Sequence, residues 1–248
     1  MKVKPACAAV VSIGTFFLLL SGIRSAQAAE IKIVSPSAYE DIEGAGSVGE
    51  DCCSPPFRYQ QVFPAADFAA LGNQPHWIVG FTNRPDQSAT SPSTVHYPDN
   101  EIRLSTMPVG PPNLSLVFDD NLGPDVMQFY RGPLIYVADI DDTSPVPREF
   151  YNAEFPAGVT PFLYDPSQGN LLFDVIAWQG EEHGSNRNDN VPGLLTALGV
   201  ENPLATRGFR GAATVFQFTF VPVPEPASWT LVGIAFVAAL ALRRRIGA

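Results

Sequence analysis

Carboxylates are the side chains of this sequence best suited to bind a cation or transfer a proton. Asp139 and Asp141 lie two positions apart in "ADIDD" (138–142), so an extended chain directs both side chains to one side. Because oxygen ligands at a strand end suit a hard cation, Asp139 and Asp141 are the candidates for a structural calcium site. The spacing is not that of an EF-hand, and the sequence predicts no other metal and no cofactor.

The arrangement of the acidic residues argues against catalysis. A glycosidase needs two carboxyl groups that face each other across the scissile bond. The acidic doublets at 119–120 and 181–182 are sequence neighbours, which point to opposite faces of a strand. None of the three histidines lies in an HExxH motif or four residues from another histidine. We therefore expect no catalytic residues and no enzyme activity, with a secreted hydrolase as the least favoured alternative.

Aromatic side chains offer a different chemistry, because an exposed ring can stack on the apolar face of a sugar. Trp178 follows the apolar stretch 171–177 and precedes the polar loop 179–190. It is therefore the candidate for a glycan contact at the rim of a sheet. We expect most of the other aromatic residues that could contribute to lie in the core; these are Trp77, Tyr97, Tyr136 and Tyr151.

The elements that must position these side chains are short strands. Apolar or alternating segments recur between turns rich in Pro, Asn and Asp, and no long helix-period pattern precedes the C-terminal tail. The predicted strands are 76–82, 101–106, 114–118, 133–139, 149–155, 171–177 and 214–221. This pattern predicts an all-β protein, built as a two-sheet sandwich or a jelly roll, with helical turns at 65–71 and 193–199.

Two of these segments show which face of a sheet should be buried. In "EIRLST", Ile102 and Leu104 alternate with polar residues, which predicts one face toward the core and one toward water. Phe216, Phe218 and Phe220 repeat the alternation with larger side chains, so we expect all three in the core.

The first 28 residues have the features of a secretory signal peptide. Lys2 and Lys4 precede an apolar stretch at 6–20, and "AQA" at 26–28 supplies the small residues that a signal peptidase recognises. The apolar stretch is shorter than the roughly 20 residues of a spanning helix. We therefore expect cleavage after Ala28, export, and one extracellular domain at 29–221.

Charge limits the partners of this domain. The chain has 15 Lys and Arg against 25 Asp and Glu. Three basic residues lie in the leader and three at the C-terminus, which leaves the body with a net charge near −16. Such a body repels phosphate backbones, so we expect no nucleic-acid partner.

Export also bears on the adjacent residues Cys52 and Cys53. An oxidising compartment disfavours free thiols, but neighbouring cysteines can close only a strained ring. An intermolecular disulfide, a vicinal disulfide and free thiols are all open.

The C-terminal tail combines three features in a fixed order. A proline-rich stem at 221–226 is followed by an apolar stretch at 227–242 and by Arg243, Arg244 and Arg245. The apolar stretch fits a short membrane helix, and positive residues remain cytoplasmic, so the body should lie outside the inner membrane. Prolines hold the stem extended and accessible.

This tail resembles the PEP-CTERM sorting signal, with Pro224, Glu225 and Pro226 as the tripeptide ahead of the apolar helix and the Arg cluster. The resemblance covers 222–248. It implies a Gram-negative bacterium, transient insertion into the inner membrane and recognition by an exosortase, a transpeptidase-like membrane enzyme. Cleavage near the tripeptide would then release or transfer the body to the cell surface or the extracellular matrix.

Stretches of the body are similar to ectodomains attached to such tails, above all "RYQQVFPAADF", "EIRLST" and "TPFLYDPSQGNLLFDV". This similarity implies an extracellular β domain and transfers no active site. We therefore expect a structural or adhesive role in exopolysaccharide, floc or biofilm. A carbohydrate-binding module that retains exopolysaccharide is the alternative.

Overall fold

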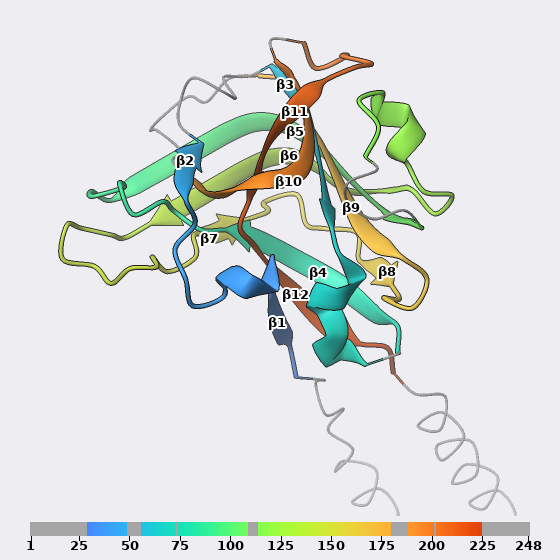
Figure 1. Ribbon diagram of the computed structural model, residues 1–248, viewed down its shortest axis with the longest axis horizontal. Coiled ribbons are helices and arrows are strands. Elements are labelled where there is room, and N and C mark those ends of the chain that lie inside the picture. The colour runs from blue at the N-terminus through green and yellow to red at the C-terminus, as the bar shows by residue number, and fades with distance from the viewer. Residues whose placement is uncertain are drawn as a thin grey trace, which may run out of the picture.

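Two antiparallel β-sheets form the body of the protein (Figure 1). The computed structural model describes residues 29–48, 56–72, 74–108, 114–179, 188–200 and 202–224. The smaller sheet has the strand order β1-β12-β4-β8, and the larger sheet has the order β11-β10-β3-β9-β5-β6-β7, with β2 paired to β10. The predicted all-β class is thereby confirmed. The predicted leader and the predicted membrane helix lie outside the described residues.

The strands of the smaller sheet are β1 (Ile31–Ser35), β4 (His76–Asn83), β8 (Phe162–Tyr164) and β12 (Phe216–Pro222). The larger sheet contains β2 (Gly46–Val48), β3 (Phe57–Phe63), β5 (Ser93–Met107), β6 (Met127–Ala138), β7 (Asn152–Glu154), β9 (Asn170–Ala177), β10 (Asn188–Val200) and β11 (Phe209–Thr214). Three short 3₁₀ helices are described: η1 (Ser37–Tyr39), η2 (Ala65–Leu71) and η3 (Phe118–Asn121). The helical turn expected at 65–71 is η2.

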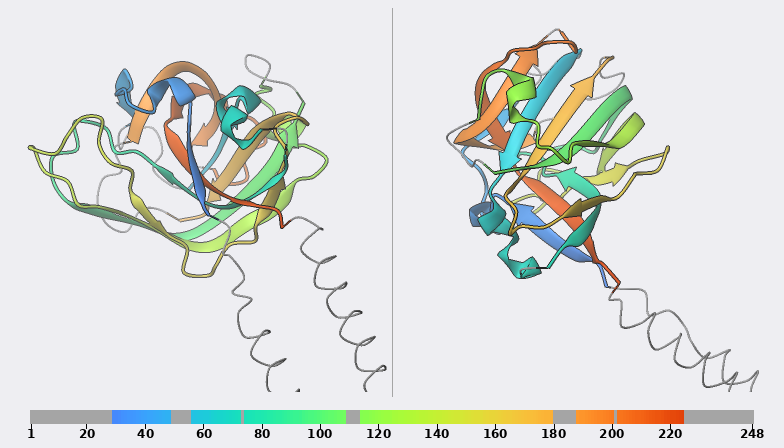
Figure 2. Two further views of the ribbon diagram at one scale, coloured as in Figure 1. Left: turned by 90° about the horizontal axis from the view of Figure 1, so that it is seen from below. Right: turned by 90° about the vertical axis from the view of Figure 1, so that its right-hand side faces the viewer.

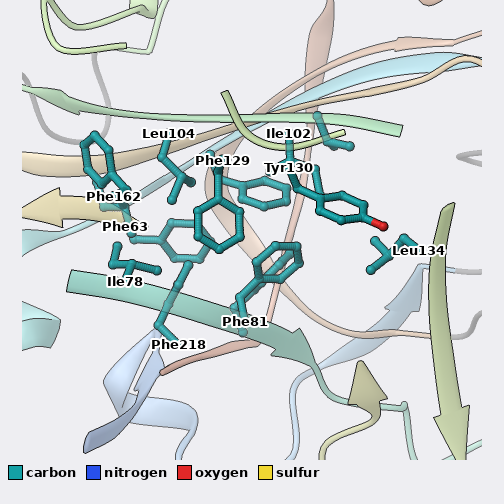
Figure 3. Close-up of a cluster of buried hydrophobic side chains, with 14 of the residues drawn as sticks. Phe63, Ile78, Phe81, Ile102, Leu104, Phe129, Tyr130, Leu134, Phe162 and Phe218 are labelled. Carbon is teal, nitrogen blue, oxygen red and sulfur yellow. The ribbon is translucent and has the colours of Figure 1, made fainter. Parts of the chain in front are cut away.

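Aromatic side chains fill the space between the sheets, as Figure 3 shows for the central residues. Phe216, Phe218 and Phe220 are 5%, 0% and 0% exposed, which confirms their predicted place in the core. The Phe218 ring centroid lies 4.8 Å from that of Phe63 on β3, in an edge-to-face contact that joins the two sheets. Phe81 of β4 contacts Phe173 of β9 in the same way at 5.0 Å.

Strand β5 shows the predicted alternation, with one departure. Ile102 and Leu104 are fully buried in the core, while Arg103 lies on the opposite face. Ser105, however, is 1% exposed although it also points away from the core. Its hydroxyl accepts a hydrogen bond from the backbone N–H of Gly123 at 3.0 Å, because η3 and its flanking turns cover this part of the outer face.

Two predicted elements are wrong. Residues 114–118 form no strand; Asn121 Oδ1 accepts from the Ser115 N–H at 2.7 Å, and Asn121 Nδ2 donates to the Ser115 carbonyl at 2.8 Å, which closes a turn into η3. Residues 193–199 lie inside β10 and form no helix, because β10 pairs with β11 on one side and β3 on the other. Both segments are apolar runs too short for their periodicity to separate strand from other structures.

Candidate functional site

The C-terminal stem, residues 221–226, shares its first two residues with the last strand, β12. Pro222, the final residue of β12, is paired with His76 of β4. Only Val223 separates Pro222 from the Pro-Glu-Pro tripeptide in the sequence, and Pro224 is exposed. The other predicted sorting residues, Glu225, Pro226, Arg243, Arg244 and Arg245, lie outside the described part of the chain. The tripeptide therefore follows a paired strand almost directly, without a long linker.

The start of the body lies beside its end. Strand β1 pairs with β12, and Ile31 is opposite Phe220. Figure 2 shows both strands reaching the same end of the molecule, where Ala29 and Glu30 are exposed. The expected leader-cleavage site after residue 28 and the Pro-Glu-Pro tripeptide therefore adjoin neighbouring strands of one sheet. Because both strands stop short of these positions, removal of either terminal segment leaves the ladder between them intact.

A family model described as the PEP-CTERM protein-sorting motif matches residues 222–245. The chain ends in a PEP-CTERM sorting motif. The resemblance inferred from the tripeptide, the apolar stretch and the Arg cluster is thus confirmed. No curated protein and no solved structure matches the chain.

The PEP-CTERM motif indicates an exported surface protein that is sorted through the membrane, because exosortases process such motifs. The match begins at Pro222, the residue that also ends β12, so the motif is continuous with the folded body. Among the described residues, no helix has the length and apolar character needed to cross a membrane.

The predicted glycan contact, Trp178, lies directly after β9 and is half-buried. Its backbone N–H donates to the Asp99 carbonyl at 2.9 Å, and its indole Nε1 is buried with no hydrogen-bond partner among the described residues. The Arg131 guanidinium carbon lies 5.3 Å from the Trp178 ring centroid. Arg131 in turn donates to Asp99 at 3.0 Å and to Glu101 at 3.3 Å. One side of the ring therefore carries a cation that two carboxylates hold in place.

The other aromatic residues considered for sugar contact are mostly internal. Tyr97, Tyr136 and Tyr151 are 7%, 5% and 3% exposed, and all three belong to the main core. Burial raises the pKa of the Tyr136 hydroxyl, so this group stays neutral. Trp77 is half-buried on β4 of the smaller sheet. Of these aromatic residues, Trp178 is the one beside charged side chains on the larger sheet.

The predicted calcium ligands Asp139 and Asp141 are exposed in the turn after β6. Asp141 Oδ1 accepts hydrogen bonds from the Thr143 N–H at 2.8 Å and the Thr143 hydroxyl at 2.7 Å. These bonds hold the pKa of the Asp141 carboxyl below its ordinary value. Within the described residues, Asp139 and Asp141 are not part of a group of three side chains close enough to share a metal ion. Calcium binding at Asp139 and Asp141 stays a prediction.

The fold brings together a different set of carboxylates, which the sequence analysis does not identify. Glu43, Asp86 and Asp189 each offer a ligand oxygen, and these oxygens lie within 4.8 Å of one another. Glu43 precedes β2, Asp86 follows β4, and Asp189 is in β10. The three positions are separated by tens of residues, so no short motif marks them. Asp86 and Asp189 are 4% and 0% exposed, which distinguishes them from solvated surface acids.

Arg84 organises the chain around this carboxylate group. It is 1% exposed, and its Nε donates to Asp189 Oδ2 at 2.9 Å. The other guanidinium nitrogens donate to the backbone carbonyls of Tyr39 at 2.8 Å and Ile42 at 2.6 Å. Asp189 Oδ1 accepts the Gly44 N–H at 2.8 Å. Arg84, at the end of β4, and Asp189, in β10, therefore bind each other, and both also bind the segment between η1 and β2.

Proposed function

We propose that an exosortase recognises the tripeptide Pro224-Glu225-Pro226, cleaves nearby and delivers the body to the cell surface or extracellular matrix of a Gram-negative bacterium. There the body acts as a structural or adhesive protein and not as an enzyme. The observation that carries the proposal is the PEP-CTERM motif at 222–245, which starts at the last residue of the last strand. Cleavage after that strand separates the tail from a sheet that keeps all its described pairings.

The ion pairs of one buried and one exposed carboxylate support a structural role. Asp174 is 1% exposed and accepts from Arg58 Nε at 3.1 Å, and Arg103 also donates to it. Asp119, which the sequence places in an acidic doublet, binds the same Arg58 at 3.0 Å. Both carboxylates are therefore engaged in ion pairs with arginines from neighbouring strands. These acids hold strands and turns together.

The mass of the mature protein from its native host tests the sorting proposal. We expect a chain that begins near Ala29 and ends near Pro226. A variant with Pro224, Glu225 and Pro226 all replaced by Ala should keep the Arg cluster in its mass, because the exosortase has lost its motif. Val223→Ala, which leaves the tripeptide intact, is the matched control and should be processed normally. A wild-type mass that includes the three C-terminal arginines would contradict the proposal.

The structural role requires a test on cells. We expect a deletion strain to lose floc or biofilm mass, and the full-length gene to restore it. The triple-alanine variant should not restore it, because its body stays at the inner membrane. Unchanged floc and biofilm in the deletion strain would argue against a structural or adhesive role while leaving the sorting proposal untouched.

A second candidate function is retention of exopolysaccharide, which the position of Trp178 favours. The half-buried ring lies beside Arg131, Asp99 and Glu101, a combination of aromatic and polar groups suited to sugars. A pull-down with exopolysaccharide from the host should retain the wild-type protein, and Trp178→Ala should reduce retention. Trp77→Ala changes a half-buried ring on the other sheet and is the control. Equal retention of both variants and the wild type would refute a Trp178 site.

A further inference from the structure

The carboxylate group Glu43, Asp86 and Asp189 carries more negative charge than its described surroundings neutralise. Arg84 forms an ion pair with Asp189. Glu43 Oε1 accepts the Gln87 N–H and Asp86 Oδ1 accepts the Ser88 N–H, each at 2.8 Å. No Lys, Arg or His of the described residues forms an ion pair with Glu43 or Asp86. Three carboxylates therefore share one arginine, although two of them are almost fully buried.

One oxygen of the group has no partner. Glu43 Oε2 is inaccessible to solvent and accepts no hydrogen bond from the part of the chain that the structure describes. An oxygen that carries negative charge and lacks both water and a donor is strongly unfavourable in a protein interior. This oxygen belongs to the side chain that joins Asp86 and Asp189 in one cluster. Glu43 as a whole is only half-buried, but the position of this oxygen favours a proton or a cation beside it.

We propose that Glu43, Asp86 and Asp189 bind a calcium ion. All three side chains offer carboxylate oxygens, which suit a hard cation, whereas zinc prefers the nitrogen and sulfur ligands of His and Cys. One divalent cation together with Arg84 supplies three positive charges to three carboxylates, so the site becomes neutral. Calcium tolerates irregular geometry and ligands from loops, while magnesium requires a near-ideal octahedron and retains several waters.

The ion would connect parts of the fold that are distant in sequence. Asp86 follows β4 of the smaller sheet, and Asp189 lies in β10 of the larger sheet. Glu43 comes from the segment that joins η1 to β2. Calcium bound to all three would hold the two sheets together at this end of the body. Burial raises the pKa of both Glu43 and Asp189 above the ordinary value, so a cation bound beside them would favour their charged forms.

Calcium binding to the full-length chain, purified in detergent and stripped with a chelator, tests this proposal. Equilibrium dialysis with radioactive calcium should show one bound ion per chain, and calcium should raise the melting temperature. At a free concentration about 100 times Kd, the folding equilibrium should shift about 100-fold toward the native state. Absence of binding at millimolar calcium would overturn the proposal.

Conservative variants locate the site. Glu43→Gln and Asp86→Asn each remove one charge and keep an oxygen acceptor for the Gln87 or Ser88 N–H. Each should weaken calcium binding at least tenfold. Asp141→Asn is the control, because it changes an exposed carboxylate in the other candidate calcium site, and it should bind as the wild type does. Binding that persists in Glu43→Gln, or that is lost in Asp141→Asn, would overturn the assignment.

Melting in chelator separates loss of a ligand from loss of the fold. Glu43→Gln should then melt at the same temperature as the wild type or higher, because the substitution removes repulsion within the carboxylate group. In saturating calcium, the order should reverse, since only the wild type gains stability from the ion. A Glu43→Gln protein that melts below the wild type in chelator would contradict the excess of negative charge on which the proposal rests.

Discussion

The buried ion pair between Arg84 and Asp189 allows a prediction whose size follows from the structure. Arg84→Met keeps a long side chain but leaves Asp189, which is 0% exposed, without its cationic partner. Breaking a buried ion pair from one side costs about 3–5 kcal/mol. The backbone carbonyls of Tyr39 and Ile42 also lose their donors, although water can reach this loop. We expect the free energy of unfolding to fall by at least about 3 kcal/mol.

Urea denaturation of the full chain in chelator measures this loss, and Arg131→Met is the matched control. Arg131 also binds two carboxylates, but its side chain is 38% exposed. An exposed pair contributes about 0–1 kcal/mol, and its contact with Trp178 adds about 0.5–1 kcal/mol. Arg84→Met should therefore lower the midpoint clearly more than Arg131→Met, at an unchanged denaturant slope. A loss for Arg84→Met that is no larger than that for Arg131→Met would refute the reasoning.

Three further predictions concern the core, a close backbone contact and an exposed turn. Phe218→Ala should cost about 3–5 kcal/mol in urea unfolding, because the ring is fully buried between the sheets; Thr219→Ala, at the next position, should cost far less. Gly44→Ala should destabilise the protein, because a Cβ at this position would lie 2.1 Å from Asp189 Oδ1. Gly80→Ala is the control, since its Cβ would meet no atom closer than 3.8 Å. Equal melting temperatures of the two variants would contradict this prediction. Hydrogen bonds from Ser167 lower the pKa of the exposed Asp165 carboxyl below its unfolded value of 3.8. The charged carboxylate therefore stabilises the protein above pH 3.8, and this stabilisation is lost as the pH falls through the folded-state pKa. The free energy of unfolding of Asp165→Asn should depend less on pH over that range than the free energy of the wild type.

The sequence predicts those features that depend on residues close together in the chain. The sorting motif is continuous, so its tripeptide, apolar stretch and Arg cluster can be recognised without a structure. The alternation of Phe216, Phe218 and Phe220 likewise specifies which face of β12 is buried, because side-chain direction in a strand repeats every two residues. Strand prediction is weaker where an apolar run is short. At 114–118, hydrogen bonds of Asn121 decide the local fold, and the apolar pattern does not reveal them.

The carboxylate group could not be predicted because its members meet only through the fold. Glu43, Asp86 and Asp189 belong to three separate segments, and each has an unremarkable local sequence. The predicted pair Asp139 and Asp141 had the opposite property, since the two residues are close in sequence and on the surface. Carboxylates in such turns accept hydrogen bonds from neighbouring N–H and hydroxyl groups, as Asp141 does from Thr143. A cation site needs carboxylates that local donors leave unsatisfied, which is the condition of Glu43.

Strand register separates the proposed calcium site from the sorting motif. His76 at the start of β4 pairs with Pro222, and Asn83 at its end pairs with Phe216. Seven residue steps at roughly 3.3 Å place these two pairs about 23 Å apart. Arg84 and Asp86 follow the far pair, so the carboxylate group lies at the opposite end of β4 from the stem. Calcium removal should therefore lower the stability of the body and leave the residues around the tripeptide unchanged. The exosortase should cleave Glu43→Gln at the same position as the wild type.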